Sequence, residues 1–287
     1  MVIAFWNIDK NTEIGDTLID FVKEKDIDIL FLAETEKKTK NDKRNCKNDD
    51  ILLDFIIKSK KNLKKEYFII PNNDFRVKTI SNYPIEYFSK KDYLFKSSRW
   101  SALNLKIPNI IELNIFPVHF YSKINWSENS LALECVNFSR DIQIVEEKTN
   151  CTNSILIGDF NMSPFENGIV ASNGLNALQD VEYLLENQKG REIDGTFYKY
   201  FYNPMWNFLG DNLSPYGTMY HRVSGHISHE WHLYDQILLR PQLRKHFNKK
   251  SFNIVTKIKG QSLLKKNNRP DEVNYSDHLP IIVELKI

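Results

Sequence analysis

Short apolar runs recur along the chain, and several are rich in β-branched side chains. Residues 2–8, 27–32, 155–157 and 233–239 are the clearest examples. Such runs suit strands that are buried on both faces. Residues 13–25, between the first two runs, carry apolar side chains at helical spacing. This order predicts a strand–helix–strand unit in which two parallel strands end at the same edge of a sheet.

The same patterns, together with the Gly, Pro and Asn turns between them, predict the other elements. We expect a strand pair around the Pro108-Asn109 turn and a long helix that leads into the strand at 155–157. In full, these further predictions are strands at 67–70, 75–80, 85–88, 99–105, 110–118 and 279–285, and a helix at 129–147. No repeat, low-complexity tract or flexible linker divides the sequence, so residues 1–287 are expected to form a single domain.

Polar side chains stand where the predicted buried strands end. Gly158 ends the strand at 155–157, and Asp159 and Asn161 follow at a spacing that directs both to one side if the extended backbone continues. A carboxylate and an amide at this position can take separate roles in a reaction at a phosphate group. The carboxylate moves a proton or holds a cation, and the amide donates to a phosphoryl oxygen. The alternative is a purely structural role, because a strand followed by an Asx-type turn would place the same residues at these positions.

Further polar residues end a predicted buried strand, lie within one or directly precede one: Asn7, Glu34, His119, Asp235, Asp277 and His278. A charge inside a buried strand needs a partner, so we expect Asp235 to pair with the Asp277-His278 segment. Each residue alone is compatible with an ordinary solvated loop or with a core position at which its hydrogen bonds are satisfied. Because buried α/β sheets gather their strand ends into one crevice, we expect the set to converge.

The overall charge is nearly balanced, with 39 Lys and Arg against 37 Asp and Glu, so net charge alone does not indicate nucleic acid. Positive charge is nevertheless grouped in residues 37–47 and again in residues 58–65. These groups begin three residues after Glu34 and would suit the phosphates of a polyanion. Solvated lysine-rich faces are the alternative.

Residues 195–232 are rich in aromatic side chains, which alternate with histidines. Such a stretch can stack on nucleic-acid bases or line an apolar pocket, and it is equally compatible with a long insertion that packs on itself. His221, His226, His229 and His232 suggest a zinc site, but no Cys or Asp accompanies them at ligand spacing. We therefore treat this range as an aromatic- and His-rich insertion in the single domain.

Cysteine usage indicates a reducing compartment. Cys46, Cys135 and Cys151 are odd in number, far apart and not arranged as a metal knuckle. The N-terminal residues show no basic segment leading into a long apolar core, and no apolar run approaches the length of a bilayer. We expect a cytoplasmic protein without stable membrane insertion.

The segments WNI, AET, PVHF, GDFN, YDQILL and SDHLP occur in this order from residue 6 to residue 280. Together they resemble the endonuclease/exonuclease/phosphatase superfamily, which includes deoxyribonuclease I-like and apurinic endonuclease-like enzymes. The resemblance implies an α/β (α+β) four-layer sandwich, with two mixed β-sheets packed face to face and flanked by helices. It also implies cleavage of phosphoester bonds with Mg²⁺, or Mn²⁺ as the alternative.

The resemblance implies a role for each matching residue. Metal ligands would be Glu34, assisted by Asn7 and Asp277, and hard oxygen donors of this kind suit Mg²⁺. Catalytic roles would fall to His119, Asp159, Asn161, Asp235 and His278. Asp235 would orient His278, Asp159 would handle a proton, and Asn161 and His119 would hold phosphoryl oxygens. Arg99, with Asn161 and His119, is a candidate for substrate binding.

Two substrate classes remain open. The basic groups and the aromatic stretch favour a nuclease whose partner is DNA or RNA. The alternative is a phosphodiesterase or phosphatase acting on a small-molecule or lipid phosphoester, with residues 195–232 as a pocket or lid. A binding module that keeps the fold without catalysis is a third hypothesis, which the complete set of polar residues disfavours.

Overall fold

The computed structural model describes residues 1–36, 50–71, 76–89, 97–187, 189–211, 214–226 and 228–287. The basic group at 37–47 and Cys46 lie outside these residues. So does the start of the strand expected at 75–80.

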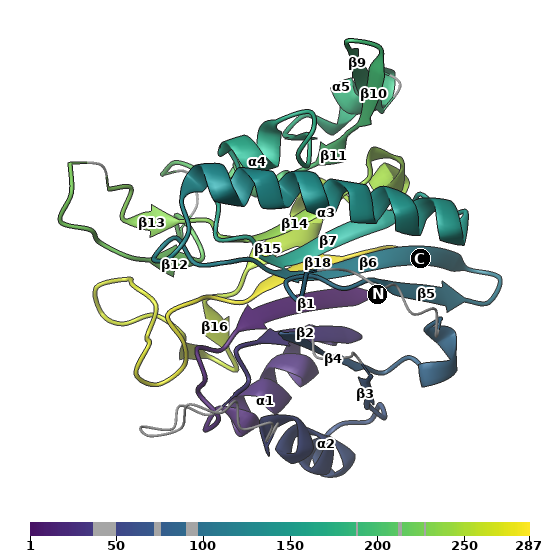
Figure 1. Cartoon of the computed structure of the whole chain (residues 1–287). Helices are drawn as coiled ribbons and strands as arrows, with labels where there is room; N and C mark the ends of the chain where they lie inside the picture. Colours follow the sequence, from purple (N-terminus) through teal and green to yellow (C-terminus); the bar gives the residue numbers. More distant parts are fainter. Residues whose placement is uncertain (37–49, 72–75, 90–96, 188, 212–213, 227) are drawn as a thin grey trace.

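Two six-stranded mixed sheets pack face to face, as the sequence resemblance implies (Figure 1). The first sheet has the order β15-β18-β1-β2-β4-β3 and the second has the order β5-β6-β7-β14-β11-β8. Strands of the first sheet are β1 (Val2–Asn7), β2 (Ile29–Ala33), β3 (Phe68–Ile70), β4 (Val77–Ser81), β15 (Phe252–Ile254) and β18 (Ile281–Glu284). Strands of the second are β5 (Leu103–Ile107), β6 (Ile111–His119), β7 (Ser154–Asp159), β8 (Ala177–Leu178), β11 (Phe201–Tyr202) and β14 (Asp235–Leu239).

Helices form the two outer layers. In Figure 1, α1 (Gly15–Lys25) and α2 (Asp50–Asn62) lie on the side of the first sheet, and α3 (Glu128–Thr149) covers the second. The Ser127 side chain caps α3 by accepting from the backbone nitrogen of Ser130, and Asn150 ends the helix in the left-handed conformation. Shorter helices are α4 (Asn167–Val170), α5 (Val181–Glu186), η1 (Ile85–Tyr87), η2 (Pro204–Phe208), η3 (Pro241–His246) and η4 (Lys249–Ser251).

The central strands are apolar because both of their faces are covered. Every residue of β2 and of β7 is buried. The parallel pair of β1 and β2 with α1 between them confirms the predicted strand–helix–strand unit. In the second sheet, β6 and β7 are parallel, whereas β14 runs antiparallel to β7. These directions bring the ends of β1, β2, β6 and β7 to the same side as the start of β14.

Three two-stranded hairpins complete the described elements: β9 (Gly190–Ile193) with β10 (Thr196–Lys199), β12 (Met219–Tyr220) with β13 (Trp231–His232), and β16 (Lys257–Ile258) with β17 (Gln261–Ser262). The range 195–232 therefore contains parts of two hairpins. It also contains β11, which pairs with β8 and β14 in the second sheet.

Two strand predictions were wrong in detail. Residues 85–87 form the 3₁₀ helix η1, because Pro84 starts a turn and Ile85 and Glu86 are exposed, whereas the buried Phe88 is extended and makes an isolated bridge to Leu105. Within 99–105, only the part from Leu103 is a regular strand, while Trp100 makes an isolated bridge to Val118.

Candidate active site

Side chains from both sheets meet where their strands end. The first sheet contributes Asn7 at the end of β1 and Glu34 just after β2, and the second contributes His119 and Asp159 at the ends of β6 and β7. His119 and Asp159 are register partners in the parallel ladder. Asp235 begins β14 opposite Asp159. The structure thus brings together residues separated by more than 200 positions in the sequence.

Glu34 lies at the junction of the two sheets. Its Oε1 accepts a hydrogen bond from Asn7 Nδ2 at 3.3 Å and lies 3.6 Å from His119 Nε2. Its Oε2 forms an ion pair with Lys10 Nζ at 2.9 Å. Burial alone would raise the pKa of Glu34, but His119 and Lys10 outweigh it and hold the pKa below its usual value. Glu34 is therefore a carboxylate at neutral pH.

Asp159 is buried between the two sheets. Its Oδ2 accepts from Asn7 Nδ2 at 3.3 Å and its Oδ1 accepts from the backbone nitrogen of Asn161 at 2.8 Å. Burial raises the pKa of Asp159 to about 7; Asp235 acts in the same direction and His278 opposes it. Asp159 can therefore both give and take a proton near neutral pH.

The backbone around Asp159 depends on Gly158 and Asn161. Gly158 has a φ of 148°, and a Cβ there would lie 2.0 Å from the carbonyl oxygen of Val118. Asn161 adopts a φ of 50° and donates from Nδ2 to the carbonyl oxygen of Phe120 at 3.1 Å. Only glycine allows β7 to approach β6 this closely, and the close approach sets Asp159 beside His119.

Asp235 and His278 form the buried pair that the sequence predicts. His278 Nδ1 and Asp235 Oδ2 are 2.7 Å apart, and Asp235 is completely buried. Burial lowers the pKa of His278, but Asp235 outweighs it and holds the pKa well above its usual value. The backbone nitrogen of His278 also donates to Ser276 Oγ at 3.1 Å, and Trp6 Nε1 donates to the His278 carbonyl at 3.0 Å. These contacts fix the imidazole in position.

His119 is buried beside Glu34 and Arg99. Burial lowers its pKa to about 4, with Arg99 acting in the same direction and Glu34 opposing. Its backbone nitrogen donates to the Arg99 carbonyl at 2.8 Å. The side-chain Nδ1 has no hydrogen-bond partner among the residues that the structure describes. A ligand oxygen could satisfy this atom.

Asp277 lies next to the cluster. Ser276 Oγ donates to Asp277 Oδ1 at 3.5 Å, which is a weak contact. Burial raises the pKa of Asp277, and the negative charges of Asp9 and Glu34 raise it further. Carboxylates that repel one another across a shared space are typical of a site for a cation.

Within the described residues, Asp159, Asp235 and His278 form a second group that could hold a metal ion, since one ligand atom from each lies within 4.8 Å of the others. This set was not the predicted one, which was Glu34, Asn7 and Asp277. The histidines of 195–232 do not form such a group in the described part of the chain.

Sequence reasoning missed Lys10 as a member of the site. Lys10 follows the apolar strand by three positions and looks like an ordinary loop lysine. Its left-handed φ of 61° and the hydrogen bond from its backbone nitrogen to the Glu34 carbonyl at 2.9 Å place its side chain on Glu34. No local sequence signal predicts that conformation for a lysine.

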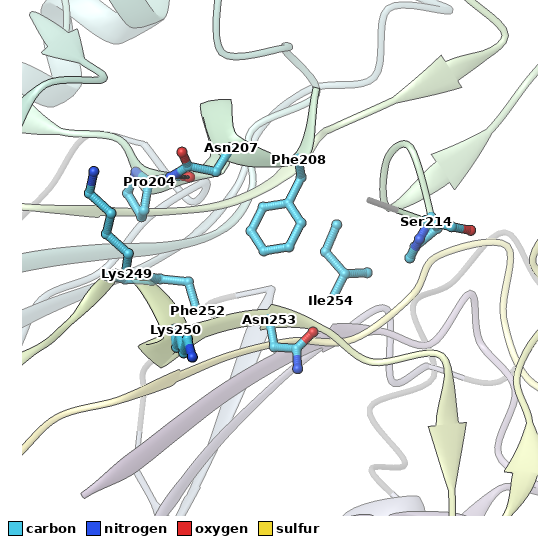
Figure 2. Close-up of a pocket in the computed structure, with 10 residues that line it drawn as sticks. Pro204, Asn207, Phe208, Ser214, Lys249, Lys250, Phe252, Asn253 and Ile254 are labelled. Atoms are coloured by element: carbon cyan, nitrogen blue, oxygen red, sulfur yellow. Dashed lines mark hydrogen bonds between the residues drawn. The ribbon is translucent and has the colours of Figure 1, made fainter. Parts of the chain in front are cut away.

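A pocket of about 260 Å³ lies between η2 and β15 (Figure 2). Phe208, Phe252 and Ile254 form its apolar wall, and Lys249 and Lys250 lie at its side. None of the strand-end residues lines this pocket, so it is separate from the cluster.

A model of the Endonuclease/Exonuclease/phosphatase family matches residues 4–278. The chain belongs to this family and is a phosphoesterase, in a family that generally depends on divalent metals. Among curated proteins, none matches the sequence.

Solved structures show the same fold at low sequence identity. An endonuclease/exonuclease/phosphatase family protein from Leptotrichia buccalis has a TM-score of 0.57 at 15% identity, with both chains fully covered. Truncated TDP2 from Caenorhabditis elegans has a TM-score of 0.55 at 14% identity, covering 100% of this chain and 97% of that one. An AP endonuclease from Archaeoglobus fulgidus has a TM-score of 0.53 at 16% identity, with both chains fully covered.

Proposed function

We propose that the protein is a Mg²⁺-dependent nuclease that hydrolyses phosphodiester bonds in DNA or RNA, with Mn²⁺ as the alternative metal. The observation that carries this proposal is the meeting of Glu34, Asp159, His119 and the Asp235–His278 pair at one edge of the sandwich. A phosphate bound between these groups would have carboxylates on one side, which can hold a cation, and imidazoles on the other, which can interact with the negatively charged phosphoryl oxygens.

We assign the metal to Glu34, assisted by Asn7 and Asp277, rather than to Asp159, Asp235 and His278. Mg²⁺ keeps several waters and therefore needs access to solvent. The Glu34 side chain is 24% exposed, whereas those of Asp235 and His278 are 0% and 6% exposed and already bond each other. When bound, the ion would offset charge on the phosphoryl group and lower the pKa of a coordinated water.

The protein side chains then divide the remaining work. Asp235 holds His278 so that the imidazole faces the phosphate or the attacking water. Asp159 moves the proton of the nucleophile or of the leaving group, which its position between the two sheets allows. His119 and Asn161 hold phosphoryl oxygens, and Arg99 binds the substrate next to His119.

Nucleic acid is the proposed substrate on two grounds. Lys60, Lys61 and Lys64 are exposed, although the neighbouring Lys58 and Lys65 are each paired with two aspartates, which reduces the positive charge that this group offers. The second ground is that proteins of the same fold have been solved with DNA. They include TDP2 from D. rerio complexed with single strand DNA product and a Neisseria 3′ phosphatase bound to a product DNA hairpin.

We also propose a cytoplasmic location and one domain with an aromatic- and His-rich insertion at 195–232. Cys135 and Cys151 are buried and free, in keeping with a reducing compartment. The described residues include no helix that is long and apolar enough to cross a membrane.

A substrate panel tests the function. Purified protein is incubated with plasmid, single-stranded DNA, RNA, sphingomyelin and phosphoinositides in Mg²⁺ or Mn²⁺, and again with EDTA. We expect EDTA-sensitive cleavage of a nucleic acid, and loss of that cleavage in Glu34→Ala, Asp159→Ala and His278→Ala. Glu182→Ala, which removes an exposed carboxylate on α5, is the matched control and should cleave like the wild type. Turnover of a lipid or a small phosphoester without nucleic-acid cleavage would replace the nuclease proposal with the alternative.

A further inference from the structure

Beside His119, three side chains form a layered stack, of which only Arg99 has a role in the proposed mechanism. The Arg99 guanidinium carbon lies 3.6 Å from the centroid of the Tyr121 ring. The Tyr121 and Trp126 rings are parallel within 6°, with centroids 3.8 Å apart. The layers are therefore a cation, a phenol and an indole, which we call the Arg99–Tyr121–Trp126 stack.

The stack is fixed to the proposed site by short connections. The Arg99 carbonyl accepts from the backbone nitrogen of His119 at 2.8 Å, and Tyr121 follows His119 by two residues. Between them, Phe120 donates its backbone nitrogen to the Asp159 carbonyl at 2.9 Å and accepts from Asn161 Nδ2 at 3.1 Å. A polymer bound at His119 and Asp159 would therefore pass next to the stack.

Trp126, at the indole end of the stack, packs against the hydrophobic core, but its neighbours along the chain are exposed to solvent. Trp126 is partly buried, but Ile124, Asn125, Ser127 and Glu128 around it are all exposed, Ile124 to 87%. Within the described residues no other aromatic ring contacts Trp126 besides Tyr121. A flat ring that is supported on one face by another ring and has solvent-exposed neighbours is suited to act as a stacking platform for a base.

The cationic end of the stack lacks a partner that a phosphate would supply. Arg99 Nε is buried and has no hydrogen-bond partner in the described part of the chain. A buried guanidinium donor without an acceptor is unfavourable, and a phosphate oxygen is a strong acceptor for it. A nucleic-acid strand offers both groups that the two ends of the stack require, a flat base and, from a neighbouring nucleotide, a charged phosphate.

We propose that the outer face of Trp126 stacks on an unpaired base of the bound strand while Arg99, on the other side of the Tyr121 ring, binds the phosphate of a neighbouring nucleotide. A base inside a duplex is stacked between neighbouring base pairs that cover both of its faces, so a base that can stack on Trp126 must first leave the duplex. The preferred substrate is therefore single-stranded nucleic acid or a frayed end. This inference rests on the proposed nuclease function and deepens it.

Binding measured without cleavage tests the stack separately from catalysis. The full-length protein is titrated in EDTA with a fluorescent single-stranded DNA 12-mer and with a blunt DNA hairpin, and anisotropy is recorded. We expect Trp126→Ala to weaken single-strand binding by about 5- to 150-fold, the range of one base–aromatic stack, and to leave hairpin binding unchanged. Trp126→Phe should keep most of the affinity. Tyr183→Ala, an exposed aromatic on α5 outside the range 195–232, is the control and should bind like the wild type.

Trp126→Leu separates stacking from packing, since leucine keeps apolar volume without a flat ring. A thermal unfolding midpoint equal to that of the wild type together with the affinity loss of Trp126→Ala supports the proposal. Wild-type single-strand affinity in Trp126→Ala, or an equal loss for strand and hairpin, overturns it. Cleavage of DNA by a Trp126→Ala protein that binds like the wild type would refute the stack and keep the nuclease. Base-dependent binding without any cleavage in Mg²⁺ or Mn²⁺ would refute the nuclease and keep the stack.

Discussion

Replacing Glu146 by glutamine should destabilise the protein strongly, although Glu146 lies far from the proposed site. The side chain projects from α3 and is 1% exposed. Its Oε1 accepts from Ser154 Oγ at 2.7 Å and from Arg240 Nε at 2.8 Å, and its Oε2 lies 3.0 Å from Lys199 Nζ. Arg240, at the end of β14, is itself 5% exposed. Glu146 therefore ties α3 to the start of β7 and to β14.

Glutamine would leave the Arg240 guanidinium buried without its counter-charge. Breaking a buried ion pair by removing one partner costs about 3–5 kcal/mol. Glu182 and Arg244 make an ion pair of the same 2.8 Å length, but their side chains are 59% and 35% exposed. A pair of that kind contributes about 0–1 kcal/mol. The two substitutions differ mainly in burial, so Glu182→Gln is the matched control.

Urea unfolding followed by far-UV circular dichroism measures both costs. The free energy of unfolding should fall by about 3–5 kcal/mol in Glu146→Gln and by less than about 1 kcal/mol in Glu182→Gln. Ser154 and Asp159 are the first and last of the six residues of β7, which is about 17 Å of strand. The turnover of folded Glu146→Gln should therefore equal that of the wild type. Equal costs for the two variants would refute the claim that burial sets the energy of this pair.

The same pair predicts a pH dependence of stability. Burial alone would raise the pKa of Glu146, but Arg240 outweighs it and holds the pKa below its usual value. A carboxyl group whose pKa is lower in the folded than in the unfolded protein stabilises the fold at any pH above its unfolded pKa, which is about 4.3 for glutamate. This stability is lost as the pH falls through the pKa of the folded protein. The difference between wild type and Glu146→Gln should therefore be full at pH 7 and shrink below about pH 4.3.

Two further predictions concern the edges of the proposed site. Gly158→Ala should lower the free energy of unfolding by about 3 kcal/mol or more, since its Cβ would collide with the Val118 carbonyl, whereas Gly225→Ala, with nothing within 4 Å, should be nearly neutral in thermal unfolding. Lys10→Gln should raise the affinity for Mg²⁺ or Mn²⁺ by roughly two- to fivefold in calorimetric titration, because the lysine competes for Glu34. An unchanged or weaker metal affinity would show that Lys10 does not compete.

The sequence predicts the central strands and the positions of most site residues because both follow from local patterns. Buried strands read as apolar runs, and their polar ends mark the sheet edge where Asn7, Asp159 and Asp235 lie. The Asp235–His278 contact could be predicted because a charge inside an apolar strand requires a partner. These inferences need no knowledge of the tertiary arrangement beyond the layering of an α/β sheet.

Other features depend on contacts that no local pattern encodes. The apolar spacing of the helix at 129–147 marks its core face, but it does not show that Glu146 is buried there by Ser154 and Arg240 from distant strands. The backbone conformation of Lys10 is likewise set by its hydrogen bond to Glu34 rather than by its own propensity. Tertiary partners decide both positions, so sequence periodicity cannot.

Several unfavourable local features lie at the same strand ends as the proposed catalytic groups. Lys10, Glu34 and Asn161 have left-handed φ values of 61°, 52° and 50°, a conformation that costs a non-glycine residue about 1–3 kcal/mol. Asp159 and Asp235 stand opposite each other in the β7–β14 ladder, where like charges destabilise a sheet. None of these features helps the sandwich to fold. The buried core must offset their cost, as expected where one edge of a stable fold serves chemistry rather than stability.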